Sequence, residues 1–402
     1  MSCTRGRSRS SATPAWHGVL ITVGGRPVWL AVSMSHMVVD VWAIRALESE
    51  LRLAAREDAG AAAVVAPAPR ALAALQHGDA WAARRRGAQK HWRRVLDTGP
   101  LHNLPALGGS SDPRGGSGGA PYERRVQATL RSHGLAVLLA EGARTHKVSP
   151  QSLLTALTAA ALAGLLGRDA VTLSLMCANR FDPAWLPVIS TMNQLVPLPC
   201  PVDRDAPLAA FVKRTHLQAL LAYRHGCYDV DAAAALAAAA LAAAAPGPDG
   251  AAFTHDCWFN YVTAPEDDGG SGPGPRPDTR GGTGTGPAAT PAATVPDATL
   301  DWSPPARNAG HPFYLRVNGD GSRWAELTLR VDPARVPQAA VPELLRTIAA
   351  GARRLLHVPD ATVGALLDGA ARDPLPADVF PPAPATAPPT TAPAPWSVQL
   401  PR

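Results

Sequence analysis

The sequence of 402 residues predicts an α/β fold with mixed sheets. Segments with the period of strands alternate with segments with the period of helices, in two blocks of the chain. A stretch rich in Gly, Ser and Pro, residues 108–121, separates the blocks and is predicted to be a linker. With 46% hydrophobic residues, the chain can bury a core in each block, and its length agrees with two domains or lobes.

The charge of the chain does not indicate a nucleic-acid partner. The formal net charge is +6, from 38 Lys and Arg against 32 Asp and Glu. Almost all of these cations are Arg, and they are scattered apart from short clusters at residues 5–9 and 84–94. A genome biased toward Ala, Arg, Gly and Pro codons gives such a composition without selection for a polyanion partner.

Cysteine usage and apolar runs predict a cytoplasmic protein. The five Cys are odd in number and show no C-x-x-C spacing, which argues against a disulfide framework or a zinc site. No apolar run has the length needed to cross a bilayer, the nearest being residues 153–166. The Arg/Ser-rich start is not followed by the apolar core of a signal peptide.

The first block is expected to begin after a flexible leader, residues 1–16. Residues 19–23 and 28–34 are β-type runs on either side of a Gly-Gly-Arg-Pro turn, which predicts a hairpin. After Asp40 the apolar residues recur at helical spacing, and Asp is a good N-cap, so a helix is predicted from there.

The rest of this block, whose predicted extent is 17–107, contains a connector at 61–69 and a helical region at 71–96. The basic residues of that helical region indicate a solvated face more than a site for an acidic partner. They are Arg84, Arg85, Arg86, Lys90, Arg93 and Arg94. The linker contains a G-x-S-x-G match, but no strand and helix flank it, so it does not indicate a hydrolase.

The second block, residues 122–368, is predicted to hold most of the sheet. Strands are expected at 122–130, 170–177, 195–201, 254–262, 313–317 and 325–331. Helices are expected at 134–145, 150–166, 208–223, 232–245 and 342–356. The Gly/Pro/Thr-rich insert 264–296 and the Pro-rich tail 369–402 are predicted to be disordered, because neither composition can build a core.

His36 is the candidate catalytic residue. It lies four residues before Asp40, on the connection between the predicted hairpin and the predicted helix. A side chain on such a connection can project into a cleft, and an imidazole can exchange a proton at neutral pH. The alternative is a partly buried structural histidine. Asp40 is expected to be a helix cap or an ion-pair partner under either interpretation.

The sequence from Ser35 to Val41, SHMVVDV, resembles the His-His-x-x-x-Asp-Gly signature of the condensation domains of nonribosomal peptide synthetases. These domains belong to the chloramphenicol acetyltransferase-like acyltransferases. Further segments resemble segments of that family in the same order, and they are residues 90–96, 166–169, 179–180, 192–198 and 257–261. The similarity covers residues 17–360 apart from the Gly/Pro inserts.

That resemblance implies a two-lobed chloramphenicol acetyltransferase-like fold with a tunnel between the lobes. Carrier-protein phosphopantetheine arms would bring substrates into the tunnel, where His36 would assist attack of an amine or hydroxyl on a thioester. Asp40 would be structural and pair with Arg180. The residues expected to line the tunnel are Ser35, Asn193 and Gln194, with a polar loop as the equal alternative for Asn193 and Gln194.

No bound cofactor and no metal are expected. A thioester needs no metal to acylate a nucleophile, and the other histidines show no ligand pairing at helical or strand spacing. The sequence contains no phosphate-binding P-loop.

The chain departs from the family signature in three respects. Ser35 replaces the first His, and Val41 replaces the Gly, whose positive φ a Val cannot adopt. Only 34 residues precede the motif, where the family carries several strands and helices, so the first lobe is expected to be incomplete. A true start further upstream, a second chain that completes the tunnel, and loss of catalysis all stay open.

Two functions follow from these features. The first is an acyltransferase that joins a carrier-tethered acyl or aminoacyl thioester to an amine or hydroxyl in nonribosomal peptide or related natural-product biosynthesis. Its partners would be peptidyl or acyl carrier proteins or synthetase modules, with no nucleic acid or membrane involved. The second is a non-catalytic scaffold or recruitment module of a synthetase assembly.

Overall fold

The computed structural model describes residues 15–54, 66–104, 124–243, 255–263, 297–307, 311–319 and 324–381. The linker 108–121 and the insert 264–296 lie outside these ranges, as do nearly all of the leader and most of the connector. The predictions for those segments stay predictions. The described residues form two compact units.

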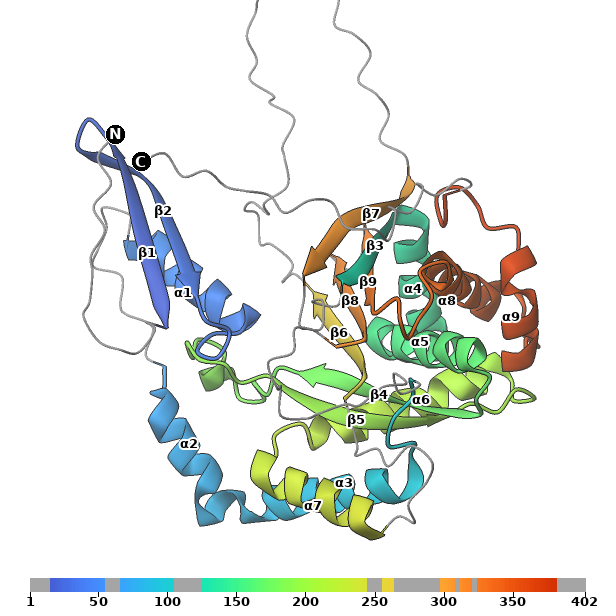
Figure 1. Cartoon of the computed structure of the whole chain (residues 1–402), viewed down its shortest axis with the longest axis horizontal. Helices are drawn as coiled ribbons and strands as arrows, with labels where there is room; N and C mark the ends of the chain where they lie inside the picture. The colour runs from blue at the N-terminus through green and yellow to red at the C-terminus, as the bar shows by residue number, and fades with distance from the viewer. Residues whose placement is uncertain are drawn as a thin grey trace, which may run out of the picture. The chain divides into compact units, whose positions relative to one another are not determined.

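The first unit contains the described residues of 1–90, 176–196 and 225–230. It begins with the predicted hairpin, formed by β1 (Trp16–Val23) and β2 (Arg26–Met34), which pair antiparallel (Figure 1). Gly24 and Gly25 both have positive φ, as a tight hairpin turn requires. Trp16 already belongs to β1, so the strand begins inside the segment predicted to be a leader.

The predicted helix at 71–96 is wrong in one respect, because it is broken at Gly78. The structure has α2 (Pro69–His77), a 3-10 turn η1 (Asp79–Trp81) and α3 (Ala82–Thr98). Arg85 donates to the carbonyls of Gln76 and Gly78, at 2.6 and 2.8 Å. It thereby supplies hydrogen-bond donors to backbone carbonyls at the C-terminal end of α2, which have no donor within the helix. At least this member of the basic set therefore has a structural role.

The apolar cluster of the first unit joins distant segments of the chain. Leu72 and Trp81 pack with Trp185 and Val188, and the two indole rings stack with centroids 5.4 Å apart. Trp185 belongs to the 3-10 turn η2 (Pro183–Trp185). This packing anchors the segment that follows Arg180.

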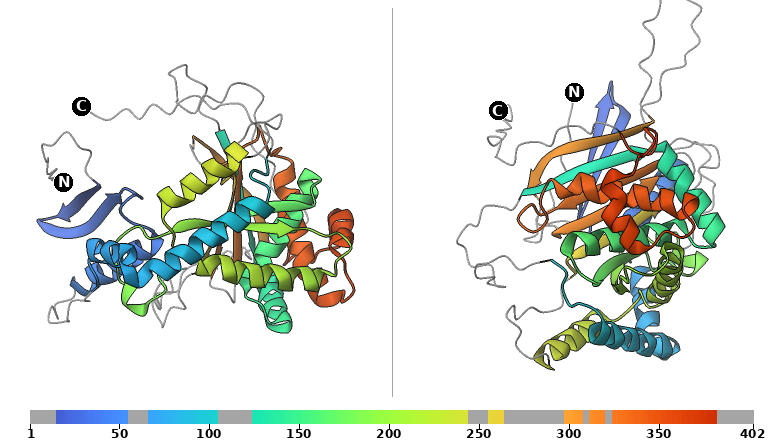
Figure 2. Two further views of the ribbon diagram at one scale, coloured as in Figure 1. Left: turned by 90° about the horizontal axis from the view of Figure 1, so that it is seen from below. Right: turned by 90° about the vertical axis from the view of Figure 1, so that its right-hand side faces the viewer.

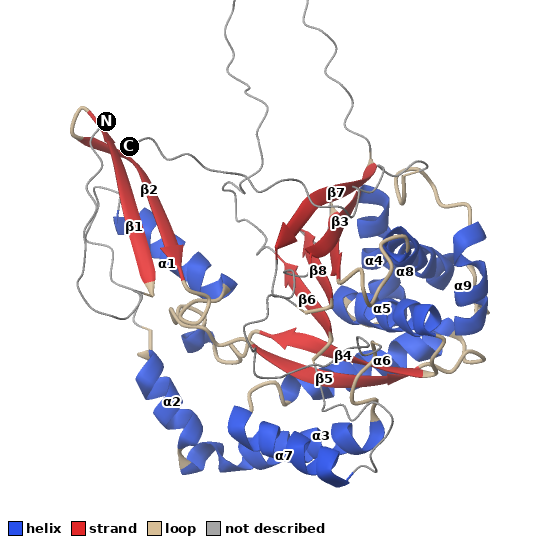
Figure 3. Cartoon of the chain, in the orientation of Figure 1, coloured by secondary structure: helices blue, strands red, loops and turns tan. Residues whose placement is uncertain are grey.

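The second unit contains the remaining described residues and most of a mixed seven-stranded sheet (Figure 3). In spatial order the strands are β5 (Gln194–Pro201), β4 (Ala170–Cys177), β6 (Cys257–Thr263), β8 (Phe313–Gly319), β9 (Ala325–Val331), β3 (Arg124–Ser132) and β7 (Ala298–Arg307). β4, β6 and β8 run parallel to one another, whereas β9, β3 and β7 each pair antiparallel with their neighbours.

The second unit also contains helices, some of which lie against this sheet (Figures 1 and 2). They are α4 (His133–His146), α5 (Pro150–Leu166), α6 (Leu208–Arg224), α7 (Val230–Ala243), α8 (Ala340–His357) and α9 (Val363–Gly369). α4 and α8 contact β9, and α5 packs against α4, α6 and α8. Nearly all of α5 is buried, which explains why its sequence is apolar all round.

Two buried polar clusters tie loops to the sheet of this unit. Asp256 accepts hydrogen bonds from the side chain of Asn103 and from the backbone N–H groups of Asn103 and Leu104, at 2.7 to 2.8 Å. Arg125 and Asp332 form a buried ion pair at 2.6 Å. Burial is tolerated because these charged groups have partners of opposite charge or hydrogen-bond donors.

Two further differences from the sequence prediction lie near the C-terminus. β7 and α9 were not predicted, and residues 369–381 of the predicted tail include a 3-10 turn, η3 (Ala370–Arg372), and the buried Val379. Arg354 pairs with Asp373 at 2.5 Å, and Phe380 is buried. Within the described ranges no single helix has the length and apolarity to cross a membrane. α4 and α5 together match a span in length and composition alone, but they are bent by 103° and α5 is a buried core helix.

Candidate active site

Asp40 caps the helix that follows the His motif. This helix is α1 (Val41–Ala54), and Oδ1 of Asp40 accepts the backbone N–H of Ala43 at 2.9 Å. That is the geometry of an N-cap, in which a side-chain oxygen satisfies a free donor of the first turn. Asp40 is 2% exposed, so its charge needs further partners.

Arg180 supplies the counter-charge. Its Nη1 lies 2.8 Å from Oδ2 of Asp40, and the side chain of each residue is 2% exposed. The other guanidinium nitrogen, Nη2, donates to the carbonyls of Val188 and Ser190 at 3.0 and 3.2 Å. Arg180 therefore holds both the start of α1 and the segment 188–190.

The segment after Ser190 also holds the motif. The backbone N–H of Met192 donates to Oδ2 of Asp40 at 2.9 Å, and the hydroxyl of Thr191 donates to the backbone carbonyl of His36. The His motif is thus fixed at two points, at His36 in the turn 36–38 and at Asp40 after that turn.

His36 itself is exposed, and its ring has a defined orientation. Nδ1 lies 2.7 Å from the carbonyl oxygen of Val39. Since a carbonyl can only accept, Nδ1 carries the proton in the neutral ring and the lone pair is on Nε2. Within the described part of the chain, Nε2 has no hydrogen-bond partner.

The three residues expected to line a tunnel have other local roles. The hydroxyl of Ser35 accepts the N–H of Met37 at 3.3 Å, within the turn that carries His36. Gln194 donates to the carbonyl of Tyr228 at 2.9 Å, and Asn193 donates to the sulfur of Met176 at 3.0 Å. These contacts place Gln194 and Asn193 in the same unit as His36, and their contact with a substrate stays a prediction.

Asn179 is a site residue that sequence reasoning missed. It has φ of 55°, a left-handed conformation that Asn tolerates better than other side chains. Its Nδ2 donates to the carbonyls of Met192 and Gly226 and to Oε1 of Gln194, at 2.9 to 3.2 Å. Asn179 therefore braces the segment that contacts Asp40 and His36. The signal in the sequence was an Asn between a strand and Arg180.

Val41 does not disturb the site. It is the first residue of α1 and so has right-handed helical geometry. Among the described non-glycine residues, only Lys147 and Asn179 have positive φ. The Gly of the family signature is therefore not needed here for its conformation.

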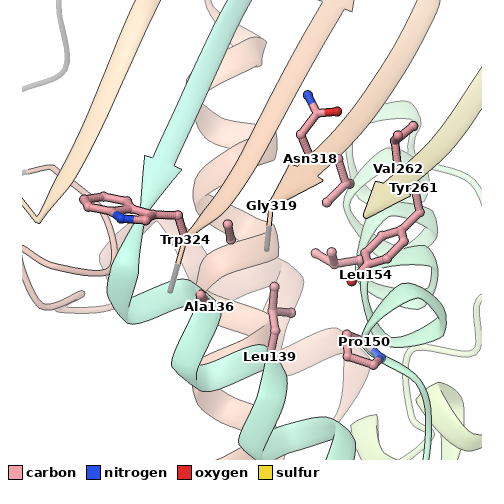
Figure 4. Close-up of a pocket in the computed structure, with 11 residues that line it drawn as sticks. Ala136, Leu139, Pro150, Leu154, Tyr261, Val262, Asn318, Gly319 and Trp324 are labelled. Carbon is pink, nitrogen blue, oxygen red and sulfur yellow. The ribbon is translucent and has the colours of Figure 1, made fainter. Parts of the chain in front are cut away.

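Elsewhere in the described chain, possible metal-ligand groups and a pocket can be compared with this site. No group of three or more His, Cys, Asp or Glu side chains among the described residues could hold a metal ion. A small pocket lies in the second unit, between the ends of β6 and β8 and the helices α4 and α5 (Figure 4). It is lined mainly by apolar side chains, and none of the predicted site residues reaches it. Burial raises the pKa of Tyr261, whose ring lines this pocket, so its hydroxyl stays protonated.

No protein-family model and no curated protein match the sequence. Solved structures do match. A condensation-domain structure from the enacyloxin polyketide synthase aligns with 87% of this chain and 62% of its own length, at 15% identity and a TM-score of 0.57. The chain thus spans under two thirds of that structure.

Two further structures have the same fold. The condensation domain of the Monacolin K polyketide synthase MokA covers 87% of this chain, aligned over 74% of its own length, with 14% identity and a TM-score of 0.59. A chain from the complex of the X-domain and OxyB from teicoplanin biosynthesis covers 88%, over 72% of its own length, with 14% identity and a TM-score of 0.58. At these identities the matches establish the fold and not the activity, and the resemblance inferred from the sequence is confirmed at that level. The protein is an α/β chain with the fold of the condensation domains of peptide and polyketide synthetases.

Proposed function

We propose that this protein is a condensation-type acyltransferase that acts on a carrier-tethered acyl or aminoacyl thioester. The observation that carries the proposal is the state of His36, an exposed imidazole with Nδ1 bound to the Val39 carbonyl and a free lone pair on Nε2. A general base needs an accessible lone pair and a fixed ring. Both conditions hold here.

The reaction would use Nε2 as a proton acceptor. As the amine or hydroxyl attacks the thioester carbonyl, a C–N or C–O bond forms and the proton passes from the nucleophile to Nε2. When the C–S bond breaks, the same proton can pass to the departing thiolate. His36 ends as it began, and no metal or redox group enters the balance.

The remaining site residues would act by positioning. Asp40 and Arg180 are buried and bonded to one another, so neither is available to a substrate. They fix the start of α1 relative to the segment that contacts His36. Substrates are expected on the phosphopantetheine arms of carrier proteins, with no other cofactor, in the cytoplasm.

The test is turnover with loaded carrier proteins. Wild type, His36→Ala and His77→Ala are incubated with an acyl-loaded donor carrier and a panel of amine and alcohol acceptors, and products are measured by mass spectrometry. His77 is an exposed histidine of the same unit and serves as the control. General-base catalysis contributes roughly 10²–10⁴-fold, so H36A should lose that much turnover while H77A keeps the wild-type rate. Equal turnover by H36A and wild type would refute the role of His36.

A recruitment module is the second candidate function. The observation in its favour is that a chain of the X-domain and OxyB complex shares this fold, so the fold occurs in a protein-protein assembly. Binding of carrier proteins or synthetase modules by affinity capture, with no product from any substrate pair, would favour recruitment over catalysis.

A further inference from the structure

The hairpin β1–β2 exposes an unusual amount of apolar surface. Nine of its large side chains are between 38 and 70% exposed. They are Trp16, Val19, Leu20, Ile21, Val23, Val28, Trp29, Leu30 and Val32. Among the described elements, only β2 packs extensively against β1, and only β1 against β2. An isolated two-stranded hairpin is at best marginally stable in water, whereas three or more strands with an apolar face can be stable.

The two edges of the hairpin are not equivalent. β2 begins with Arg26 and Pro27, and the register shifts between Ile21 and Thr22 leave an irregularity on that strand. Charge, Pro and irregularity are the features that block pairing at a sheet edge. β1 reads WHGVLITV, without Pro, Lys, Arg, Asp or Glu. β1 is therefore the edge at which another strand can add.

We propose that β1 pairs antiparallel with β1 of a second copy of this chain. The two-fold axis of such a pair is perpendicular to the sheet and keeps each side chain on its own face. Directly opposed residues must then share a face, so their numbers sum to an even value. Two central registers satisfy this, one with Val19 opposite its own copy and one with Leu20 opposite its own copy and Val19 opposite Ile21.

The sequence of β1 suits two-fold pairing. A symmetric pair places a charge near the centre of the strand beside the same charge of its copy, and like charges opposite one another destabilise a sheet. β1 contains no fixed charge, so this penalty is absent. The product is a four-stranded sheet ordered β2, β1, β1, β2, in which apolar side chains such as Leu20 and Leu30 share one face. Edge pairing buries less than the roughly 800 Å² per partner of a standard interface, so we expect a dimer that dissociates on dilution.

The test is the oligomeric state of the full chain by sedimentation equilibrium over a range of concentrations. Val19→Lys puts two cations across the proposed interface and is expected to raise the dimer dissociation constant by about tenfold or more. Val32→Lys is the matched control, because Val32 is as exposed as Val19, 38 against 39%, but lies on β2. It is expected to leave the constant within about threefold of the wild-type value.

A mixture of two oppositely charged variants tests whether loss of the dimer results from charge repulsion or from a variant that fails to fold. Val19→Lys and Val19→Glu should each be monomeric, and an equimolar mixture should dimerise, because opposite charges then face each other. Amides of β1 that point away from β2 should also exchange more slowly at high protein concentration. A wild-type chain that stays monomeric, equal effects at positions 19 and 32, or a mixture that stays monomeric would each overturn the proposal.

Discussion

Asp40 joins a helix cap, an ion pair and a backbone contact in one buried carboxylate. Replacing it by Asn keeps the shape but leaves the guanidinium of Arg180 buried without a counter-charge. Removing one partner of a buried pair costs roughly 3–5 kcal/mol. We expect Asp40→Asn to lower the free energy of unfolding by about that amount, measured by urea denaturation.

An exposed ion pair provides the control for that measurement. Glu48 and Arg52 pair at 2.6 Å on α1, but their side chains are 56 and 61% exposed. Such pairs contribute about 0–1 kcal/mol. Glu48→Gln should therefore change the free energy of unfolding little. A loss for Asp40→Asn as small as that for Glu48→Gln would show that the buried pair adds no specific stability.

Thr191 is the residue that fixes the backbone of His36. Thr191→Val removes the hydroxyl without changing the shape, so the His36 carbonyl loses its donor, whereas Thr191→Ser retains it. A hydrogen bond of this kind contributes roughly 0.5–1.5 kcal/mol. The N–H of Val38 donates within the same turn, to Ser35. We expect its exchange with deuterium to be about 3- to 10-fold faster in the Val variant and unchanged in the Ser variant. Equal rates in the two variants would contradict this.

At the scale of elements, the sequence predicted the bounds of a helix correctly where a capping residue stands at each end of that helix. α5 begins after Ser149, whose hydroxyl accepts the N–H of Ser152, and it ends at Gly167 with φ of 60°. The helix predicted from the sequence, 150–166, has the same bounds. The break at Gly78 was missed, because Gly inside a helical pattern is often tolerated. The break is stabilised by Arg85, which donates to the backbone carbonyls of Gln76 and Gly78 at the end of α2. These contacts join residues up to nine positions apart.

β7 was missed for a different reason. Its sequence contains Pro304 and Pro305, which normally exclude a strand. β7 lies at the edge of the sheet, and its pairing with β3 is irregular between Arg125 and Gln127, where the prolines occur. An edge strand can accept Pro because one side has no ladder to complete. Edge position is a property of the whole sheet, so a local pattern could not reveal it.

Helix packing gives a prediction at Gly351, in the middle of α8. Ala is the better helix former by about 1 kcal/mol. However, an added Cβ would lie 2.5 Å from Leu157, which is fully buried in α5. Overpacking of this kind costs roughly 1–3 kcal/mol. The net effect expected for Gly351→Ala is a loss in the free energy of unfolding of up to about 2 kcal/mol.

Gly18 is the control for Gly351. The nearest atom to a Cβ added there belongs to the Trp16 ring, at 3.5 Å, which is an ordinary contact. Gly18→Ala should stay within about 0.5 kcal/mol of wild type in urea denaturation. A Gly351→Ala protein more stable than wild type would show that α5 and α8 separate easily and that helix propensity dominates.

At the scale of the whole molecule, the sequence could not predict which distant segments meet. The first unit combines residues from three separate stretches, and Asn103 meets Asp256 across 153 positions. The pairing of Asp40 with Arg180 was expected only through a family resemblance, because no local pattern joins residues 140 positions apart. The contact of Thr191 with His36 had no such precedent and was missed. The candidate catalytic residue was identified from the sequence, but most of the residues that hold it in place were not.

Two half-buried histidines of the second unit predict how stability depends on pH. His255 lies 2.7 Å from the hydroxyl of Ser174, and the ring of His311 stacks on Trp258 with centroids 3.4 Å apart. Burial lowers the pKa of each histidine from 6.5 to about 4, with a further lowering of the His255 pKa by His311. For His311, the cations Arg330 and Arg125 lower the pKa further, while a hydrogen bond to the backbone of His255 and the charge of Asp256 oppose the shift.

The sign of the effect follows from proton counts. Between pH 6.5 and 4 the unfolded chain binds protons at these two positions and the folded chain does not, so the folded state loses stability as the pH falls through that window. Each such proton contributes up to about 1.4 kcal/mol per pH unit.

His311→Phe keeps a ring against Trp258 but cannot titrate. Its free energy of unfolding, measured in urea at pH 7, 6 and 5, should therefore fall less steeply than that of wild type, by about 1 kcal/mol per pH unit between pH 6 and 5. The same change at the exposed His77 should leave the slope as in wild type. Parallel curves for His311→Phe and wild type would mean that His311 takes up its proton in the folded state as readily as in the unfolded chain.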